Sequence, residues 1–247
     1  MQSLYTNGFE NIYDDMYQTF IDYEKEFQFY SEIILKQQKK DVLEIGCGSG
    51  RLASHFINSP IHYSGMDLSN EMVELSRNKN PEGTFYNGDM TGFNLNNTYD
   101  SIIITARTTS YLLNNIAIQK AIKNISNHLN DNGVLCFDFI DASRFFPSIK
   151  NGKTVIHEAT INDKNYSRIS YMKPNVIKEN FMFQWNAKYY QTINGEQTLL
   201  TEDQSEVRAF TKNEWELFLN LNDFKIIEMI DRKSYAFDTY VVVAQKQ

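Results

Sequence analysis

Apolar residues in the first half of the chain follow two alternating patterns, short continuous runs and runs that recur every three or four positions. Continuous runs such as 41–45 and 100–105 are typical of strands that are buried on both faces of a parallel sheet. The helical spacing occurs in residues 22–40, 49–57, 70–79 and 116–129. Strands that alternate with helices in this way predict an α/β fold with a doubly wound, mostly parallel sheet.

The pattern changes at about residue 141, where helical spacing gives way to short β-branched and aromatic runs. We expect antiparallel strands at residues 154–156, 166–171, 181–190 and 198–200. Between the last two, Asn194-Gly195 is a strong hairpin signal. Helical spacing returns at residues 212–221, and two further strands are expected at 225–230 and 239–244.

This change of pattern divides the chain into two parts. The alternating strands and helices of residues 1–140 and 211–247 are expected to form one cofactor-binding domain. The insert, residues 141–210, follows the fifth strand at 134–139, so it should fold over the strand ends as an antiparallel β lid or substrate subdomain. Its aromatic residues could cover an active site or form a dimer face, and a monomer and a homodimer both remain open.

A glycine-rich turn follows the first strand, since residues 44–50 read Glu-Ile-Gly-Cys-Gly-Ser-Gly. Glycine allows φ angles that are closed to other residues and removes the side chains that would keep the backbone from a ligand. A dinucleotide fingerprint needs a further glycine where this chain has Arg51, so an NAD-dependent oxidoreductase is improbable. The acidic Glu44 suits a ligand that carries an ammonium group better than one that carries two phosphates.

Polar residues follow the other predicted strands at the same edge of the sheet. Asp67 ends the second strand, 23 residues after Glu44, where a ribose diol would be bound by its carboxylate. Asp89 follows the third strand, where a loop could meet an adenine edge. Thr105 and Asp138 end the next two strands. The carboxyl ends of parallel strands form the ligand crevice of such folds, so we expect these residues to converge.

The chain resembles the class I S-adenosylmethionine-dependent methyltransferases through the turn at 44–50, Asp-Leu-Ser at 67–69, Gly-Asp-Met at 88–90 and Asn-Gly-Val-Leu at 132–135. Within that family it is most similar to small-molecule enzymes related to sugar N,N-dimethyltransferases and glycine N-methyltransferases, through residues 13–17, 110–112 and the insert. The resemblance implies a Rossmann-like seven-stranded sheet whose seventh strand is antiparallel. It also implies S-adenosylmethionine as cofactor, S-adenosylhomocysteine as product, and no metal.

The resemblance implies roles for individual residues. Met72 and Met90 would sandwich the adenine, although ordinary core packing explains a methionine equally well. Arg107 would bind a carboxylate of the cofactor or substrate, with a surface ion pair as the alternative. The full set of expected cofactor-binding residues is Tyr17, Glu44, Gly46, Cys47, Gly48, Gly50, Asp67, Leu68, Met72, Asp89, Met90, Thr105 and Arg107.

Methyl transfer from a sulfonium is an in-line displacement, so catalysis rests mainly on the alignment of the reacting atoms. The expected acceptor is the amine nitrogen of a small molecule, which Tyr13 would orient. Transfer to a hydroxyl or carboxylate would need a stronger base, for which Asp141 and His157 are the candidates. A non-catalytic, cofactor-binding regulatory protein is a further alternative.

Charge and composition narrow the possible partners and location. The net charge is −7 and no basic stripe is present, which argues against nucleic acid as a substrate. The N-terminus shows neither a basic leader nor an apolar core, and no apolar run approaches the roughly 20 residues that cross a bilayer. Neither cysteine looks placed for a structural disulfide, and no histidine has metal-ligand spacing. The sequence therefore predicts a cytoplasmic protein that neither associates with a membrane nor binds a metal.

Overall fold

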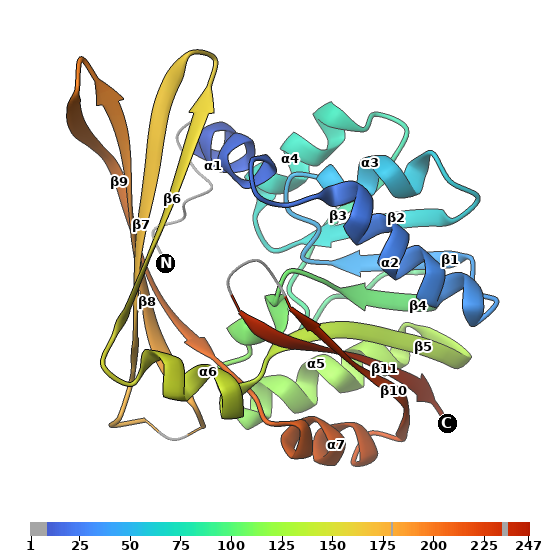
Figure 1. Ribbon diagram of the computed structural model, residues 1–247. Helices are drawn as coiled ribbons and strands as arrows, with labels where there is room; N and C mark the ends of the chain where they lie inside the picture. The colour runs from blue at the N-terminus through green and yellow to red at the C-terminus, as the bar shows by residue number, and fades with distance from the viewer. Residues whose placement is uncertain (1–8, 179, 234–236) are drawn as a thin grey trace.

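The computed structural model describes residues 9–178, 180–233 and 237–247, which form a seven-stranded and a four-stranded sheet (Figure 1). The order of the larger sheet is β10-β11-β5-β4-β1-β2-β3, and β11 runs antiparallel between β10 and β5. This order confirms the doubly wound, mostly parallel fold and the antiparallel last strand. The strands are β1 (Asp41–Ile45), β2 (His62–Asp67), β3 (Thr84–Asn87), β4 (Tyr99–Ile104), β5 (Leu129–Ile140), β10 (Phe224–Lys233) and β11 (Asp238–Lys246).

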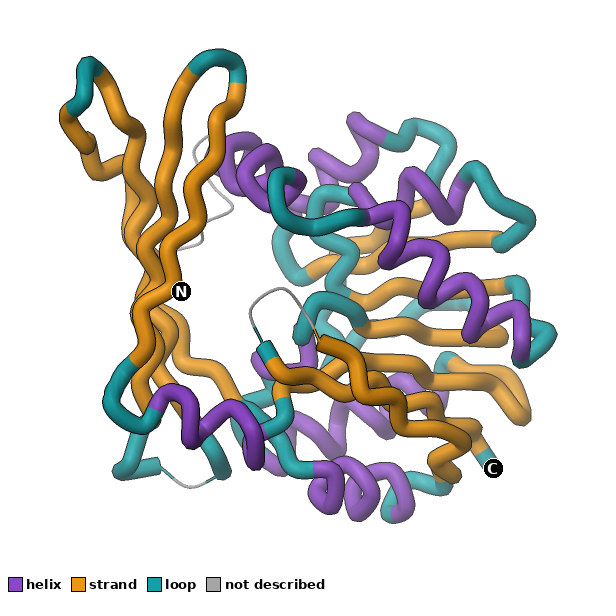
Figure 2. The backbone as a smooth tube through the Cα atoms, in the orientation of Figure 1, coloured by secondary structure: helices purple, strands orange, loops and turns teal. Residues whose placement is uncertain are grey.

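Helices cover both faces of the seven-stranded sheet (Figures 1 and 2). On one face, α5 (Asn115–Asn127) and α7 (Lys212–Asn220) pack on the strands, with the buried Trp215 against Phe137. On the other face lie α2 (Tyr23–Lys36), α3 (Arg51–Ile57) and α4 (Asn70–Lys79). The central strands β1, β4 and β5 are largely buried on both sides, which explains their continuous apolar runs.

Several helices begin at local side-chain caps. Ser69 accepts a hydrogen bond from the Met72 backbone N–H and begins α4, as its sequence predicts. Thr211 and Glu214 form a reciprocal capping box at α7. The helix expected from residue 49 begins instead at Arg51, because Gly50 has a left-handed φ of +76°.

The insert forms a second, wholly antiparallel sheet in the order β6-β7-β8-β9. Asn194 and Gly195 make the β8–β9 turn with φ angles of +52° and +85°, which confirms the predicted hairpin. The expected strands at 154–156 and 198–200 were too short, because the polar residues of the exposed face interrupt the apolar signal. The strands are β6 (Lys153–Ile161), β7 (Lys164–Pro174), β8 (Met182–Ile193) and β9 (Glu196–Arg208).

Two further helices connect the sheets. The sequence does not predict α6 (Ala142–Ile149), which contains Pro147 and packs Phe145 against Met172 and Phe183 of the four-stranded sheet. The N-terminal α1 (Phe9–Gln18) lies between the four-stranded sheet and the α3–α4 region of the larger domain (Figure 2). Both cysteines are buried and free. In the described ranges, no helix is both long and apolar enough to cross a membrane, and no acidic, histidine or cysteine cluster could hold a metal.

Candidate active site

The glycine turn connects β1 to α3 in left-handed backbone conformations, with φ of +80° at Gly46, +54° at Gly48 and +76° at Gly50. A Cβ on Gly46 would lie 2.7 Å from the Thr108 side chain, and one on Gly50 would lie 2.7 Å from Asn80 Nδ2. A Cβ on Gly48 would meet nothing within 4 Å. Two of these glycines are therefore required by protein packing, whereas Gly48 leaves bare backbone beside open space.

Asp67 is held against this turn by two backbone groups. Its Oδ2 accepts a hydrogen bond of 2.8 Å from Gly48 N–H, and its Oδ1 accepts one of 2.9 Å from Ser69 N–H. Burial raises the pKa of Asp67, although the backbone hydrogen bonds act in the opposite direction. The carboxylate at the end of β2 is thus fixed beside Gly48, where the sequence placed a ribose contact.

Glu44 is buried directly beneath the turn. Its two oxygens accept hydrogen bonds of 2.5 Å from the Tyr63 hydroxyl and 2.8 Å from the Thr105 hydroxyl. Burial raises the pKa of Glu44 to about 7, and the nearby Asp67 adds to the increase. A carboxylate has about four lone-pair sites, so Glu44 retains acceptor capacity for a cationic group. Thr105, expected at the cofactor, supports Glu44 from the end of β4.

The loop after β4 carries two consecutive residues with positive φ, Ala106 and Arg107. Backbone of this kind is strained for non-glycine residues and is frequent at functional sites. The Arg107 N–H donates a hydrogen bond of 2.6 Å to Asp138 at the end of β5, and its guanidinium lies 5.0 Å from the Phe237 ring centre. Burial raises the pKa of Asp138 to about 6, against the lowering effect of Arg107.

One face of the four-stranded sheet is turned toward this edge of the larger sheet. Residues that pair across antiparallel strands share a face, and the register pairs Arg168 with both His157 and Tyr189. The Tyr17 hydroxyl of α1 accepts a hydrogen bond of 2.8 Å from the Arg168 guanidinium. Burial raises the pKa of Tyr189 well above its ordinary value, and Arg168, Tyr17 and Tyr111 lie near enough to influence it. These residues from α1, β6, β7 and β8 therefore form one cluster.

The candidate catalytic residues lie in different surroundings. Tyr13 stacks on Tyr17 at 4.2 Å between ring centres and packs against the insert. His157 stacks on Phe20, and burial together with Arg168 lowers the pKa of its imidazole. Asp141 caps α6, accepting hydrogen bonds from Ser143 and Arg144, so its contacts account for a structural role.

Other predicted cofactor residues are spread around the turn. Cys47 and Met72 are buried, and Met90 packs against the core of the larger domain. Leu68 is exposed beside Asp67. Asp89 is exposed, and its carboxylate accepts hydrogen bonds from Thr91. The described contacts leave an adenine role for these residues as a prediction.

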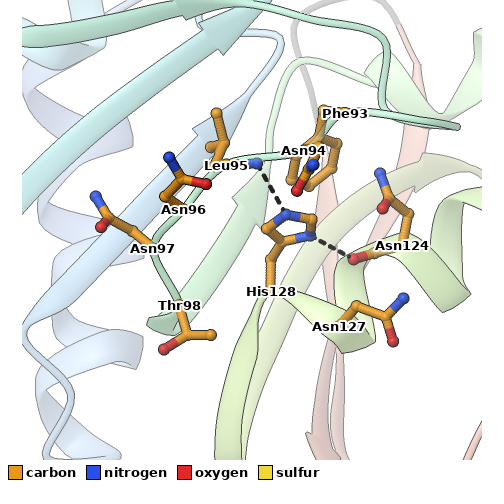
Figure 3. A pocket seen from close by; sticks show the side chains of 9 residues that line it. All are labelled: Phe93, Asn94, Leu95, Asn96, Asn97, Thr98, Asn124, Asn127 and His128. Atoms are coloured by element: carbon orange, nitrogen blue, oxygen red, sulfur yellow. Dashed lines mark hydrogen bonds between the residues drawn. The ribbon is translucent and has the colours of Figure 1, made fainter.

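A pocket of about 360 Å³ lies at the opposite edge of the sheet, between the loop that precedes β4 and the start of β5 (Figure 3). His128 lies at its centre, where Nε2 accepts from Leu95 N–H and Nδ1 donates to the Asn124 carbonyl. The ring also packs on Phe93. His128 is therefore a packed structural residue, and this pocket is remote from the glycine turn.

Sequence reasoning missed several partners of the site. Tyr63 supports Glu44, Arg168 lies in the centre of the insert cluster, and Asp14 contacts the glycine turn. None of the three had a local signal in the sequence, because each contacts residues far away along the chain.

Comparison with known proteins gives consistent results. Residues 42–133 match the methyltransferase domain family. The chain is 23% identical over 137 residues to the dTDP-3-amino-3,6-dideoxy-α-D-glucopyranose N,N-dimethyltransferase of Streptomyces fradiae, covering 54% of each chain. It is 29% identical over 171 residues to an uncharacterized methyltransferase of Bacillus cytotoxicus, covering 65% of this chain and 80% of that one. The chain spans about half the length of the Streptomyces dimethyltransferases that it matches.

Solved structures extend the likeness of the fold to nearly the whole chain. An S-adenosylmethionine-dependent methyltransferase of Clostridium acetobutylicum has a TM-score of 0.76 at 19% identity and covers 96% of this chain and 97% of its own. An amino pentose methyltransferase of Micromonospora echinaspora, solved with S-adenosylmethionine bound, has a TM-score of 0.77 at 17% identity with full coverage of both chains. The insert therefore belongs to the shared fold.

Proposed function

We propose that this protein, which carries a methyltransferase domain resembling the class I S-adenosylmethionine-dependent enzymes, moves a methyl group to an amine nitrogen of a small polar acceptor. The family match at residues 42–133 covers the glycine turn, Asp67 and Asp89. Several relatives, including those of Streptomyces fradiae and Streptomyces venezuelae, are amino-sugar N,N-dimethyltransferases, which favours nitrogen as the acceptor atom.

The residues around the glycine turn fit this cofactor. Gly48 offers bare backbone beside open space, Asp67 presents a carboxylate there for the ribose hydroxyls, and Glu44 supplies a buried carboxylate for the ammonium group. When bound, S-adenosylmethionine supplies a methyl group attached to a positively charged sulfur. The chain itself contributes orientation and the exclusion of water, which can account for roughly 7–11 kcal/mol of barrier reduction.

One observation on the insert supports the binding of a polar acceptor there. Three buried polar atoms on the inner face, Ser170 Oγ, Trp185 Nε1 and Tyr189 Oη, have no hydrogen-bond partner within residues 9–178, 180–233 and 237–247. The register places them together, because Ser170 pairs with Ala187, which lies between Trp185 and Tyr189 on the same face of β8. Buried polar groups are normally satisfied, so this face is suited to bind a polar ligand.

Contacts of Trp185 support an orientation of this face toward the edge of the larger sheet that carries the glycine turn. Trp185 packs on Phe237 at 5.2 Å between ring centres, and the Arg107 guanidinium lies over the same Phe237 ring. An acceptor bound on the sheet would therefore lie between β7–β8 on one side and Arg107 and Phe237 on the other. Its amine needs only to be neutral and aligned, so no dedicated strong base is required.

The direct test combines calorimetry with a methylation assay. We expect saturable binding of S-adenosylmethionine and no binding of NADH, followed by S-adenosylhomocysteine formation with amino sugars or other small amines. Turnover with hydroxyl or carboxyl compounds alone would move the assignment to O-methylation. In that case His157, whose pKa is lowered, is the candidate base, and His157→Ala should abolish turnover with cofactor binding intact. Binding without turnover on either panel would favour a regulatory protein.

Replacing Tyr189 by phenylalanine should raise the KM for the acceptor about fivefold, because one hydrogen bond in the acceptor site is lost. The Kd for S-adenosylmethionine should remain unchanged, since Tyr189 lies on the insert. Tyr190→Phe is the matched control, because Tyr190 is the next residue of β8, pairs with Ser167 and lies on the other face of the sheet. Equal KM values for the two variants would argue against this acceptor face.

A further inference from the structure

A single carboxylate joins α1 to the cofactor turn. Asp14 is only 3% exposed, and it accepts hydrogen bonds from the Ser49 hydroxyl, from Arg51 Nε at 3.0 Å and from Lys79 Nζ. Ser49 lies between Gly48 and Gly50 in the turn, Arg51 begins α3, and Lys79 ends α4. Asp14 therefore contacts the residue next to Gly48, the position where the turn leaves bare backbone.

The contact is charged at neutral pH. Burial alone would raise the pKa of Asp14, but the hydrogen bonds from Arg51, Lys79 and Ser49 outweigh it and hold the pKa below its ordinary value. Hydrogen bonds between ionised partners are shorter and stronger than neutral ones. The neighbouring Asp15 differs, because its side chain is 39% exposed and accepts only longer hydrogen bonds, of 3.3 Å from Arg51 and 3.2 Å from Gln18.

The opposite side of α1 packs on the insert. Met16 is buried in a cluster with Ala187 and Tyr189, and Phe9 packs edge-on against Tyr189 at 5.0 Å. Tyr17, which follows Met16 in α1, accepts the hydrogen bond from Arg168 of β7. One helix of ten residues is thus held by charge on the cofactor side and by apolar packing on the acceptor side.

We propose that Asp14 is a positioning residue that fastens α1 to the glycine turn and thereby slows release of the bound cofactor. This inference rests on the proposed function only in the identity of the cofactor. Because Asp14 bonds to Ser49 directly, its loss frees both α1 and the middle of the turn. Because α1 also carries Tyr17, loosening it weakens the acceptor side of the site.

The test compares Asp14→Asn with Asp15→Asn in the full chain. Asp14→Asn should raise the dissociation rate constant of S-adenosylhomocysteine and its Kd about tenfold, because the cations Arg51 and Lys79 lose their anionic partner. Hydrogen exchange of the α1 amides should become faster, while exchange of β1, β4 and β5 stays at the wild-type rate. Asp15→Asn should remain within about twofold of the wild type in each measurement.

Each outcome decides the proposal. Wild-type dissociation kinetics and α1 exchange in Asp14→Asn would overturn it. If that variant does not fold, Lys79→Met removes one cation and leaves Ser49 and Arg51 on Asp14, and it should raise the dissociation rate constant about threefold. If the wild type binds no cofactor, the proposed function fails. In that case α1 exchange alone decides whether Asp14 fastens the helix.

Discussion

Replacing Gly48 by alanine is expected to lower the affinity for S-adenosylmethionine about 100-fold, or by about 3 kcal/mol, while the protein stays folded. A Cβ at this position meets no protein atom within 4 Å. The added methyl group would instead occupy the space in which the cofactor comes close to the backbone of the turn. The φ of +54° costs an alanine about 1 kcal/mol of folding stability, because this region is disfavoured for residues with a Cβ. Calorimetry for binding and urea unfolding for stability measure the two effects separately.

Gly195→Ala is the matched control for this variant. Gly195 also has a positive φ, of +85°, and a Cβ there also meets nothing within 4 Å, but it lies in the β8–β9 hairpin turn. It should show the same loss of stability with unchanged affinity for the cofactor. If Gly48→Ala binds as tightly as Gly195→Ala, the cofactor does not approach the turn at Gly48, and the predicted binding mode is wrong.

Local signals account for the parts of the site that the sequence predicted. The turn at 44–50, the Ser69 cap and the Asn194-Gly195 hairpin are each specified by residues within a few positions of one another. Such short-range rules also located β1, β2 and β4 and hence the edge where Glu44 and Asp67 meet. The family resemblance added the antiparallel place of β11, which strand pattern alone does not determine.

The remaining parts depend on contacts between distant residues. Gly46 and Gly50 look equivalent to Gly48 in the sequence, yet Thr108 and Asn80 determine that they serve packing. The role of Asp14 also depends on distant residues, because its partners lie 35 to 65 positions away along the chain. Asp141 is a candidate base in the sequence because it follows β5, but the unpredicted α6 begins there and Asp141 caps it. Periodicity carries no information about pairings of this range.

Affinity for S-adenosylmethionine is expected to fall as the pH is lowered from 8 to 6, because Glu44 gains a proton in this range. Burial raises the pKa of Glu44 to about 7, so the unliganded site holds a carboxylate above this pH and a neutral carboxyl below it. Only the carboxylate pairs with the ammonium group of the cofactor. Asp138, whose pKa is raised to about 6, also titrates here, so the Glu44→Gln variant is needed to isolate the effect.

Glu44→Gln should bind the cofactor about 30-fold more weakly than the wild type at pH 8, since a charged hydrogen bond is lost. The difference should shrink toward pH 6, where the wild-type carboxyl is itself neutral. Glu216→Gln, which removes an exposed charge on α7, should follow the wild-type curve. Calorimetric titrations at pH 6, 7 and 8 test this directly, and a wild-type Kd that is flat across the range would contradict the ammonium role of Glu44.

The folding stability of Glu44→Gln should change in the opposite direction to its affinity for the cofactor. The folded-state pKa of about 7 exceeds the ordinary value of 4.5, so the native state binds the proton more tightly than the unfolded chain. The stabilising contribution of Glu44 is therefore fully present below pH 4.5 and is lost as the pH rises through 7, a change of up to about 3 kcal/mol. Glutamine avoids this loss and still pairs with the hydroxyls of Tyr63 and Thr105, which both donate and accept. Urea unfolding should show Glu44→Gln gaining on the wild type between pH 5 and 8, so that weaker binding accompanies higher stability, whereas an ordinary packing defect would lower both.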